Sequence, residues 1–285
     1  MYERLYRSFE LFQASLAVLR KDRMLLVFPL FSIVALALLA LSFLLPLGGM
    51  RVLEAFGGHG RSPTAIQEAC AFLFYLIQYF IIFFFNTALA GAVMKQLDGE
   101  MPTIADGLRI AASRLFPIIG YAFIAATVGM LLHALQERLG IVGRIVAGLL
   151  GVAWSLATYL VVPVLVASDV GPIQAIVESA DLFKRTWGES VIGKGGLGLA
   201  FAAIYVVVIL CGSMLMCLAG GTLHSRSFMV LVQLVLVGAL LLIGLLYATL
   251  SGIYAVALYR HANGFHDNPE FDARWLDHAF QLPGS

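Results

Sequence analysis

The chain has 285 residues, of which 61% are hydrophobic and only 12% charged, about half the charged share of an average soluble domain. Its formal net charge is +1, which argues against nucleic acid or a strongly acidic molecule as a partner. This composition excludes an ordinary soluble globular domain and indicates an integral membrane protein.

The chain opens with an amphipathic segment rather than with a cleavable signal peptide. Residues 4–20 carry apolar side chains at helical spacing on one side, with charged side chains on the other. The apolar run after them has about 24 residues, too many for the core of a signal peptide, and no small-residue cleavage site closes it. We therefore expect this run to be retained as a membrane span. The stripe of the amphipathic segment consists of Leu5, Phe9, Phe12, Leu16 and Leu19.

Six long apolar segments follow one another, and no Asp, Glu, Lys or Arg lies in the middle of any of them. Each has the roughly 20 residues that a helix needs to cross about 30 Å of hydrocarbon. Because a backbone in lipid must satisfy its own hydrogen bonds, the segments predict six transmembrane helices in an all-α membrane protein. The predicted spans are 24–47, 69–94, 115–135, 145–167, 196–219 and 229–257. They form a single domain over residues 1–285, with a short cytoplasmic tail at 265–285.

Two further amphipathic segments lie at 103–114 and 173–187, so that one such segment precedes each pair of spans. The chain therefore reads as three copies of one unit, a cytoplasmic interfacial helix followed by a transmembrane hairpin. A weak likeness between GAVMKQLDG at Gly91–Gly99 and VALYRHANG at Val256–Gly264 supports this repeat. The alternative is that any six-span protein with amphipathic connections looks this way. The two stripes consist of Ile104, Leu108, Ala111 and Leu115, and of Ile173, Ile176, Ala180, Phe183 and Trp187.

The second span carries the longest polar stripe inside the membrane, formed by Tyr75, Gln78, Tyr79 and Asn86. Asn86 lies deep in the span, where an unpaired amide would be costly. One interpretation is hydrogen bonding between helices, and the sharper one is that the stripe lines a path for a solute.

Small residues recur along the spans and predict seams where helices approach closely. Packing within the chain is the simplest interpretation, and a subunit interface or a pore lining are the alternatives. The predicted seam residues are Gly148, Gly151, Ser155 and Thr158 in the fourth span, and Gly244 and Ala248 in the sixth.

No residues form a recognisable catalytic set, so we expect a protein that is not an enzyme and holds no metal or cofactor. The histidines and aspartates of the tail lack metal-ligand spacing, and the glycine-rich run Gly193–Gly196 lacks the spacing of a phosphate-binding loop. Cys70, Cys211 and Cys217 lie in or beside apolar runs, where we expect them to act as small packing residues rather than as disulfides.

The distribution of basic residues predicts the orientation of the chain. With six spans, 13 Lys and Arg residues fall on the side of the two termini and 5 on the other side. By the positive-inside rule, both termini are expected to be cytoplasmic.

Several segments resemble a family of uncharacterised bacterial multi-pass membrane proteins, catalogued as a domain of unknown function. The resemblance implies six helices and a bacterial inner-membrane location, and it brings no known catalytic residues. The helix-then-hairpin plan is also loosely similar to the membrane domains attached to some glycerophosphodiester phosphodiesterases. The matching segments are LRKDRMLLVFPLFS (Leu19–Ser32), GRIVAGLLGVAWSLATYLVVPVLV (Gly143–Val166), GPIQAIVESADLFKRTWGES (Gly171–Ser190) and ALYRHANG (Ala257–Gly264).

Two functional hypotheses follow from these features. The first is an oligomeric, channel- or transporter-like protein that passes ions, small solutes or lipid, because polar residues lie deep in a charge-free membrane domain. The second is a non-catalytic scaffold or accessory subunit, because three interfacial helices could bind a membrane-protein partner. Both hypotheses place the chain in the lipid bilayer, as a homo-oligomer or with another membrane protein, and neither involves nucleic acid.

Overall fold

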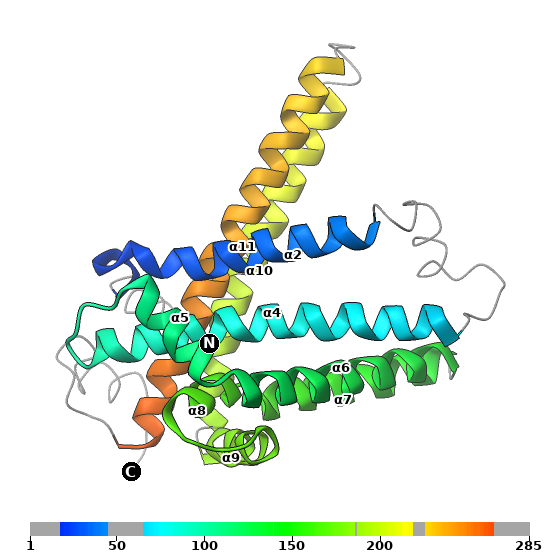
Figure 1. The fold of residues 1–285 in the computed structure, drawn as a ribbon. Helices are drawn as coiled ribbons and strands as arrows, with labels where there is room; N and C mark the ends of the chain where they lie inside the picture. The colour runs from blue at the N-terminus through cyan, green and yellow to red at the C-terminus, as the bar shows by residue number, and fades with distance from the viewer. Residues whose placement is uncertain (1–17, 45–64, 139, 186, 219–225, 265–285) are drawn as a thin grey trace, which may run out of the picture. The chain divides into compact units, whose positions relative to one another are not determined.

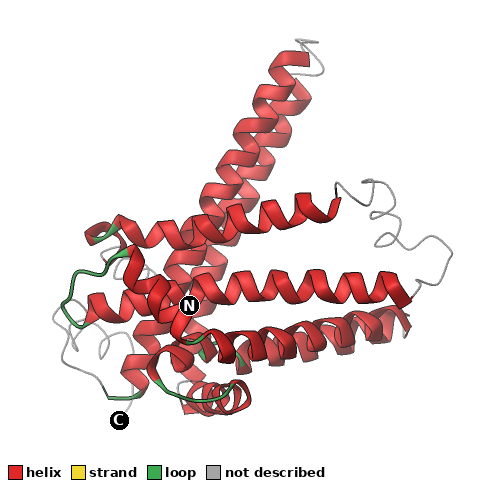
Figure 2. Cartoon of the chain, viewed as in Figure 1, coloured by secondary structure: helices red, strands yellow, loops and turns green. Residues whose placement is uncertain are grey.

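A computed structural model describes residues 18–44, 65–138, 140–185, 187–218 and 226–264, and every element in these ranges is a helix (Figure 2). Six helical stretches among the described residues are long and apolar enough to cross a membrane. The prediction of an all-α protein with six helices of spanning length is thus confirmed. Most of the predicted helix at 4–20 and the predicted tail at 265–285 lie outside the described residues.

The chain divides into two compact units, of which the larger is Val27–Arg185. Four long helices of this unit lie side by side, each packed against the next one in chain order (Figure 1). Three short helices gather at the end of these four where α4 ends and α6 begins. The long helices are α2 (Val27–Leu44), α4 (Ala65–Leu97), α6 (Leu115–Arg138) and α7 (Gly140–Ala157), and the short ones are α5 (Ile104–Ser113), α8 (Val161–Ala167) and α9 (Pro172–Arg185).

Small residues near the end of α4 let α5 lie directly on it. Ala88 and Ala92 are fully buried there, and a β-carbon built on Gly91 would lie only 2.8 Å from Ile110 Cγ2. On the α5 side, a β-carbon on Gly107 would lie 2.5 Å from Phe28 Cζ and 2.7 Å from the carbonyl oxygen of Ala88. The absence of a side chain at these two glycines therefore sets how closely α5 docks.

The predicted span at 145–167 is two helices rather than one, because the chain turns at Thr158–Leu160 between α7 and α8. The Tyr159 N–H donates to the Leu156 carbonyl at 3.3 Å, a tighter pairing than in an α-helix. The Leu160 N–H, left without its helical acceptor, donates to Ser179 Oγ of α9 at 3.0 Å. Since Leu160 and Ser179 are both fully buried, this hydrogen bond makes the break compatible with an apolar surrounding.

The second unit comprises Met1–Leu26 and Thr186–Ser285. Its two long helices, α10 (Trp187–Leu218) and α11 (Arg226–Ala262), run side by side, and the short η1 (Arg23–Leu26) contacts α11. The Tyr205 hydroxyl of α10 donates to the Leu240 carbonyl of α11 at 3.4 Å and lies 2.9 Å from where a β-carbon on Gly244 would be. Gly244, a predicted seam residue, therefore faces α10.

The outer faces of the spans carry large apolar side chains that stay exposed within their own unit among the described residues. Leu38 on α2 is 62% exposed, Leu149 on α7 is 68% exposed and Leu199 on α10 is 71% exposed. In water such faces would be an aggregation hazard, so they indicate contact with lipid. The protein is a multi-pass membrane protein.

Candidate functional site

The four polar residues predicted to line a path lie along one side of α4, and each keeps partial exposure after the neighbouring helices have packed. Tyr75, Tyr79 and Asn86 share one stripe of the helix, and Gln78 lies beside them. Phe83 occupies the same stripe between Tyr79 and Asn86, because the stripe repeats every three or four residues. The polar stripe is therefore interrupted by an aromatic ring.

Aromatic side chains surround the inner part of this stripe. The Tyr79 ring stacks on Phe83 with centroids 5.7 Å apart, and Phe83 in turn lies 4.3 Å from the Tyr121 ring of α6. The Tyr79 hydroxyl lies 3.3 Å from where a β-carbon on Gly129 would be, so this glycine of α6 makes room for it. Around Tyr79, the stripe is therefore packed against aromatic rings.

A polar link connects this cluster to the break between α7 and α8. The buried Tyr121 hydroxyl interacts with the Thr158 hydroxyl, which itself donates to the Trp154 carbonyl at 2.8 Å. Thr158 was predicted as a packing residue. At the break between α7 and α8, it also makes side-chain hydrogen bonds. Hydrogen bonding of a threonine to the preceding turn is a common companion of a bent helix.

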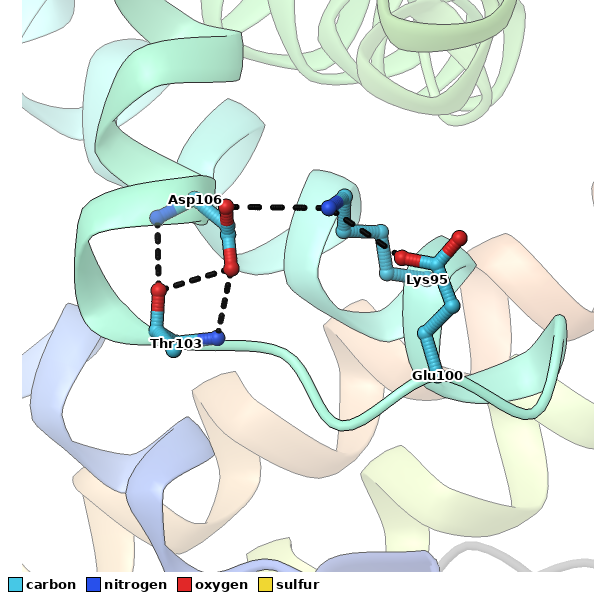
Figure 3. A network of polar contacts seen from close by, with 4 residues as sticks. All are labelled: Lys95, Glu100, Thr103 and Asp106. Carbon is cyan, nitrogen blue, oxygen red and sulfur yellow. Dashed lines mark hydrogen bonds and ion pairs between the residues drawn. The ribbon is translucent and has the colours of Figure 1, made fainter.

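A second polar site lies where α4 passes into α5 (Figure 3). The Lys95 ammonium is 3.2 Å from Glu100 Oε2 and 3.6 Å from Asp106 Oδ1. Asp106 Oδ2 accepts from the Thr103 N–H at 3.0 Å and from the Thr103 hydroxyl at 2.7 Å, and Thr103 Oγ1 accepts from the Asp106 N–H at 3.1 Å. These bonds form a capping box that starts α5 and ties it to α4.

The Asp106 carboxylate is stabilised in its charged form by this site. Its pKa is lowered from the ordinary value of 3.8, first by the hydrogen bond from the Thr103 hydroxyl, then by the Thr103 backbone N–H and by Lys95. Asp106 lies off the apolar stripe predicted for residues 103–114. The spacing of Thr103 and Asp106 at the start of an apolar stripe is the signal that could have found the cap.

An ion pair between Arg114 and Asp169 joins the start of α6 to the connection between α8 and α9. Close by, Pro172 Cγ of α9 lies 2.8 Å from where a β-carbon on Gly120 of α6 would be. Together with the hydrogen bond from Leu160 to Ser179, these contacts hold α9 against α6 and α8.

Only part of the small-residue stripe predicted as a seam on α7 contacts another described helix. A β-carbon on Gly148 would meet nothing within 4 Å, one on Gly151 would meet only Leu132 at 3.8 Å, and Ser155 is exposed. The buried positions of α7 are Gly143 and Ala147. The seam within the chain thus follows a neighbouring stripe of the same helix, and Gly148 lies on an open face.

The three cysteines differ from the expectation that they pack inside the protein. Cys70, Cys211 and Cys217 are unpaired and exposed. Since all three lie on spans, their exposure places them on faces that lipid or another protein chain would cover. In the described ranges, no group of three or more His, Cys, Asp or Glu side chains is placed to hold a metal ion.

An all-helical chain with six spanning-length helices defines a polytopic membrane protein. This chain belongs to a family of unknown function, DUF6159, whose family model matches residues 65–268. No curated protein and no solved structure matches it.

Proposed function

We propose that the protein is a polytopic protein of a bacterial inner membrane, with both termini cytoplasmic, that forms part of a path for ions, small solutes or lipid. The observation that carries the proposal is the stripe of Tyr75, Gln78, Tyr79 and Asn86, which stays partly exposed along a membrane span. With no charged side chain in the middle of the span, selectivity would come from path width and from dipoles rather than from a ring of charges.

The proposed path lies between copies of the chain, not inside one. Phe83 stacks on Tyr79 and packs against Tyr121 of α6, so aromatic rings occupy the space beside the stripe within a single chain. A β-carbon on Gly148 would meet nothing within 4 Å, so α7 is open at this position to the approach of a second helix. We therefore include a homo-oligomer in the proposal.

The proposal keeps the three-unit plan, in which an interfacial helix precedes each transmembrane hairpin. In the larger unit, α5 precedes the neighbouring pair α6 and α7, and α9 precedes α10 in the chain. Similarity to the membrane domains attached to glycerophosphodiester phosphodiesterases would concern this plan alone. The proposal assigns no catalytic step to any residue.

Flux through reconstituted liposomes tests the proposal. Purified protein should pass small ions or neutral solutes, and Asn86→Leu should change that flux severalfold while leaving thermal stability in detergent unchanged. Gln233→Leu is the matched control, because this polar residue is exposed on α11 and the same replacement there should leave flux unaltered. A monodisperse monomer that passes no tested solute would contradict the proposal.

The second candidate is a non-catalytic scaffold or accessory subunit. It is favoured by the aromatic packing around Tyr79, which interrupts the polar stripe of α4. For a scaffold, Asn86→Leu would have no effect on transport, whereas purification from native membranes in mild detergent would recover a membrane-protein partner in fixed proportion.

A further inference from the structure

The helices α5 and α9 lie at the same end of the larger unit, and they use their apolar residues differently (Figure 1). On α5, the buried positions Gly107 and Ala111 face the α4 side. Its exposed residues are small or polar, and none is a large apolar side chain. The exposed α5 residues are Ala105, Arg109, Ala112 and Ser113.

On α9, the buried face differs from the predicted stripe, because Ile173 is not on it. The buried residues are Ala175, Ser179, Leu182 and Phe183, with the polar Ser179 among them because its hydroxyl serves the Leu160 N–H. Satisfying that buried N–H rotates α9 about its axis relative to the apolar pattern. Ile173 is left 69% exposed as a result.

The exposed side of α9 forms one stripe whose character changes along the helix. Ile173 and Val177, 69% and 57% exposed, occupy its first half. Asp181 and Lys184, an exposed ion pair at 3.3 Å, follow at helical spacing in its second half. The stripe thus passes from apolar to charged within two turns, over about 12 Å of helix rise.

Contacts with α6 place the apolar half of α9 beside the first turns of a helix that is long and apolar enough to span a membrane. The α9 residue Pro172 packs on Gly120, which lies five residues, or about 8 Å, inside the span that starts at Leu115. At the first turns of the same span, Phe116 is 86% exposed and Ile119 is 43% exposed. The apolar half of α9 therefore lies at the level where the lipid-facing surface of α6 begins.

We propose that α9 is a lipid-contacting helix that lies obliquely at the bilayer surface, with Ile173 and Val177 among the acyl chains and Asp181 and Lys184 among the headgroups. A lipid bilayer is the fitting occupant because its own polarity changes over the same short distance as the exposed stripe does. The exposed side of α5 carries no large apolar side chain, so at the same interface this side faces water rather than acyl chains. This inference depends on the spans and not on any path through the membrane.

Photo-crosslinking in the otherwise native chain tests the inference. Benzoylphenylalanine is placed singly at position 173 or 177, with positions 105 and 112 of α5 as matched controls, and the protein is reconstituted in phosphatidylethanolamine–phosphatidylglycerol vesicles. After irradiation, mass spectrometry should find phospholipid adducts at 173 and 177 and at most a trace at 105 and 112. Adducts between two protein chains at 173 would show that protein covers α9, and equal lipid yields at all four positions would also overturn the inference.

A fluorescence experiment keeps the inference testable if the bulky photoreactive residue disturbs folding. Val177→Cys and Ala105→Cys are made in a chain whose three native cysteines are replaced by alanine, and each is labelled with bimane. Brominated lipids should quench the label at 177 and aqueous iodide should quench the label at 105. Iodide quenching at 177 as strong as at 105 would place α9 in water and refute the proposal.

Discussion

Gly107 and Gly148 show how differently two helical glycines can be used in one unit. Gly107 lies where Phe28 and the Ala88 carbonyl leave no space for a side chain, whereas Gly148 faces open space. An alanine at either position should gain helix propensity, by about 1 kcal/mol. Only at Gly107 does this gain compete with a steric cost, because the 2.7 Å neighbour there is backbone and cannot turn aside.

We therefore expect Gly107→Ala to destabilise the protein by about 1–3 kcal/mol, the usual range for overpacking a close contact. Gly148→Ala, the matched control, should be neutral or stabilising by up to about 1 kcal/mol. Unfolding of both variants in a detergent titration measures the two changes. Equal stability of the two variants would mean that α5 does not dock closely on α4.

Ser179 is the residue on which the helix break depends. Ser179→Ala would leave the buried Leu160 N–H without its acceptor, which should cost about 1–3 kcal/mol. Ser113→Ala is the control, because the Ser113 hydroxyl only donates to the Ile110 carbonyl at an exposed position. The same unfolding measurement should show little change for the control. An unchanged Ser179→Ala protein would indicate that another group satisfies the Leu160 N–H.

At the scale of helices, composition was enough to predict the six spans, because a run of apolar residues has few alternatives to a helix in lipid. The break at Thr158–Leu160 has one local signal, Pro163 in the first turn of α8, which lacks the N–H that a continuous helix would pair with the Tyr159 carbonyl. The stabilising partner Ser179 lies 19 positions away and was not predictable. The buried face of α9 differs from its predicted apolar stripe and includes Ser179, which makes the same hydrogen bond. Which stripe is buried depends on one long-range hydrogen bond and not on the local apolar period.

The candidate site, too, was predictable from the sequence only in part. The polar stripe of α4 follows from helical spacing, and its residues lie on one helix side as expected. The contact of Phe83 with Tyr121 depends on which helix neighbours α4, which the sequence does not specify. Gly148 shows the same limit. Helical spacing predicted a stripe of small residues on α7, but it could not tell which stripe of α7 faces the other helices.

The junction of α4 and α5 should be sensitive to acid. Because the folded-state pKa of Asp106 lies below its ordinary 3.8, the carboxylate stabilises the fold fully above that pH and ceases to do so as pH falls through the folded-state pKa. Asp106→Asn should therefore lower stability at neutral pH, and its deficit relative to wild type should shrink as pH falls below 3.8. The free energy of unfolding in detergent, measured for both proteins as a function of pH, tests this expectation.

The control is Asp181→Asn, because Asp181 is an exposed carboxylate paired with Lys184 and its replacement should change stability little. A deficit that persisted at the acid end would mean that the amide disturbs the cap by its shape.

At the scale of the whole molecule, orientation follows from charge. The rule that cytoplasmic connections carry the excess of Lys and Arg gives a 13 to 5 split in favour of the side of the termini. Within the larger unit, Lys95, Arg114 and Lys184 belong to the end where α5 and α9 gather, and Arg144 to the opposite end of α7 (Figure 1). The predicted cytoplasmic side is thus the side of the short helices.

Single cysteines test this orientation in a chain whose native Cys70, Cys211 and Cys217 are replaced by alanine, because all three are exposed and would react themselves. His59→Cys lies in the predicted outer connection and His266→Cys in the predicted cytoplasmic tail, two positions outside the described ranges. A membrane-impermeant maleimide added to intact cells should label position 59, and it should label position 266 only after the membrane is permeabilised. Labelling of 266 but not 59 in intact cells would invert the molecule and place α5 and α9 on the outer surface. Labelling of both would require an even number of spans between them, whereas the six-span fold places five there.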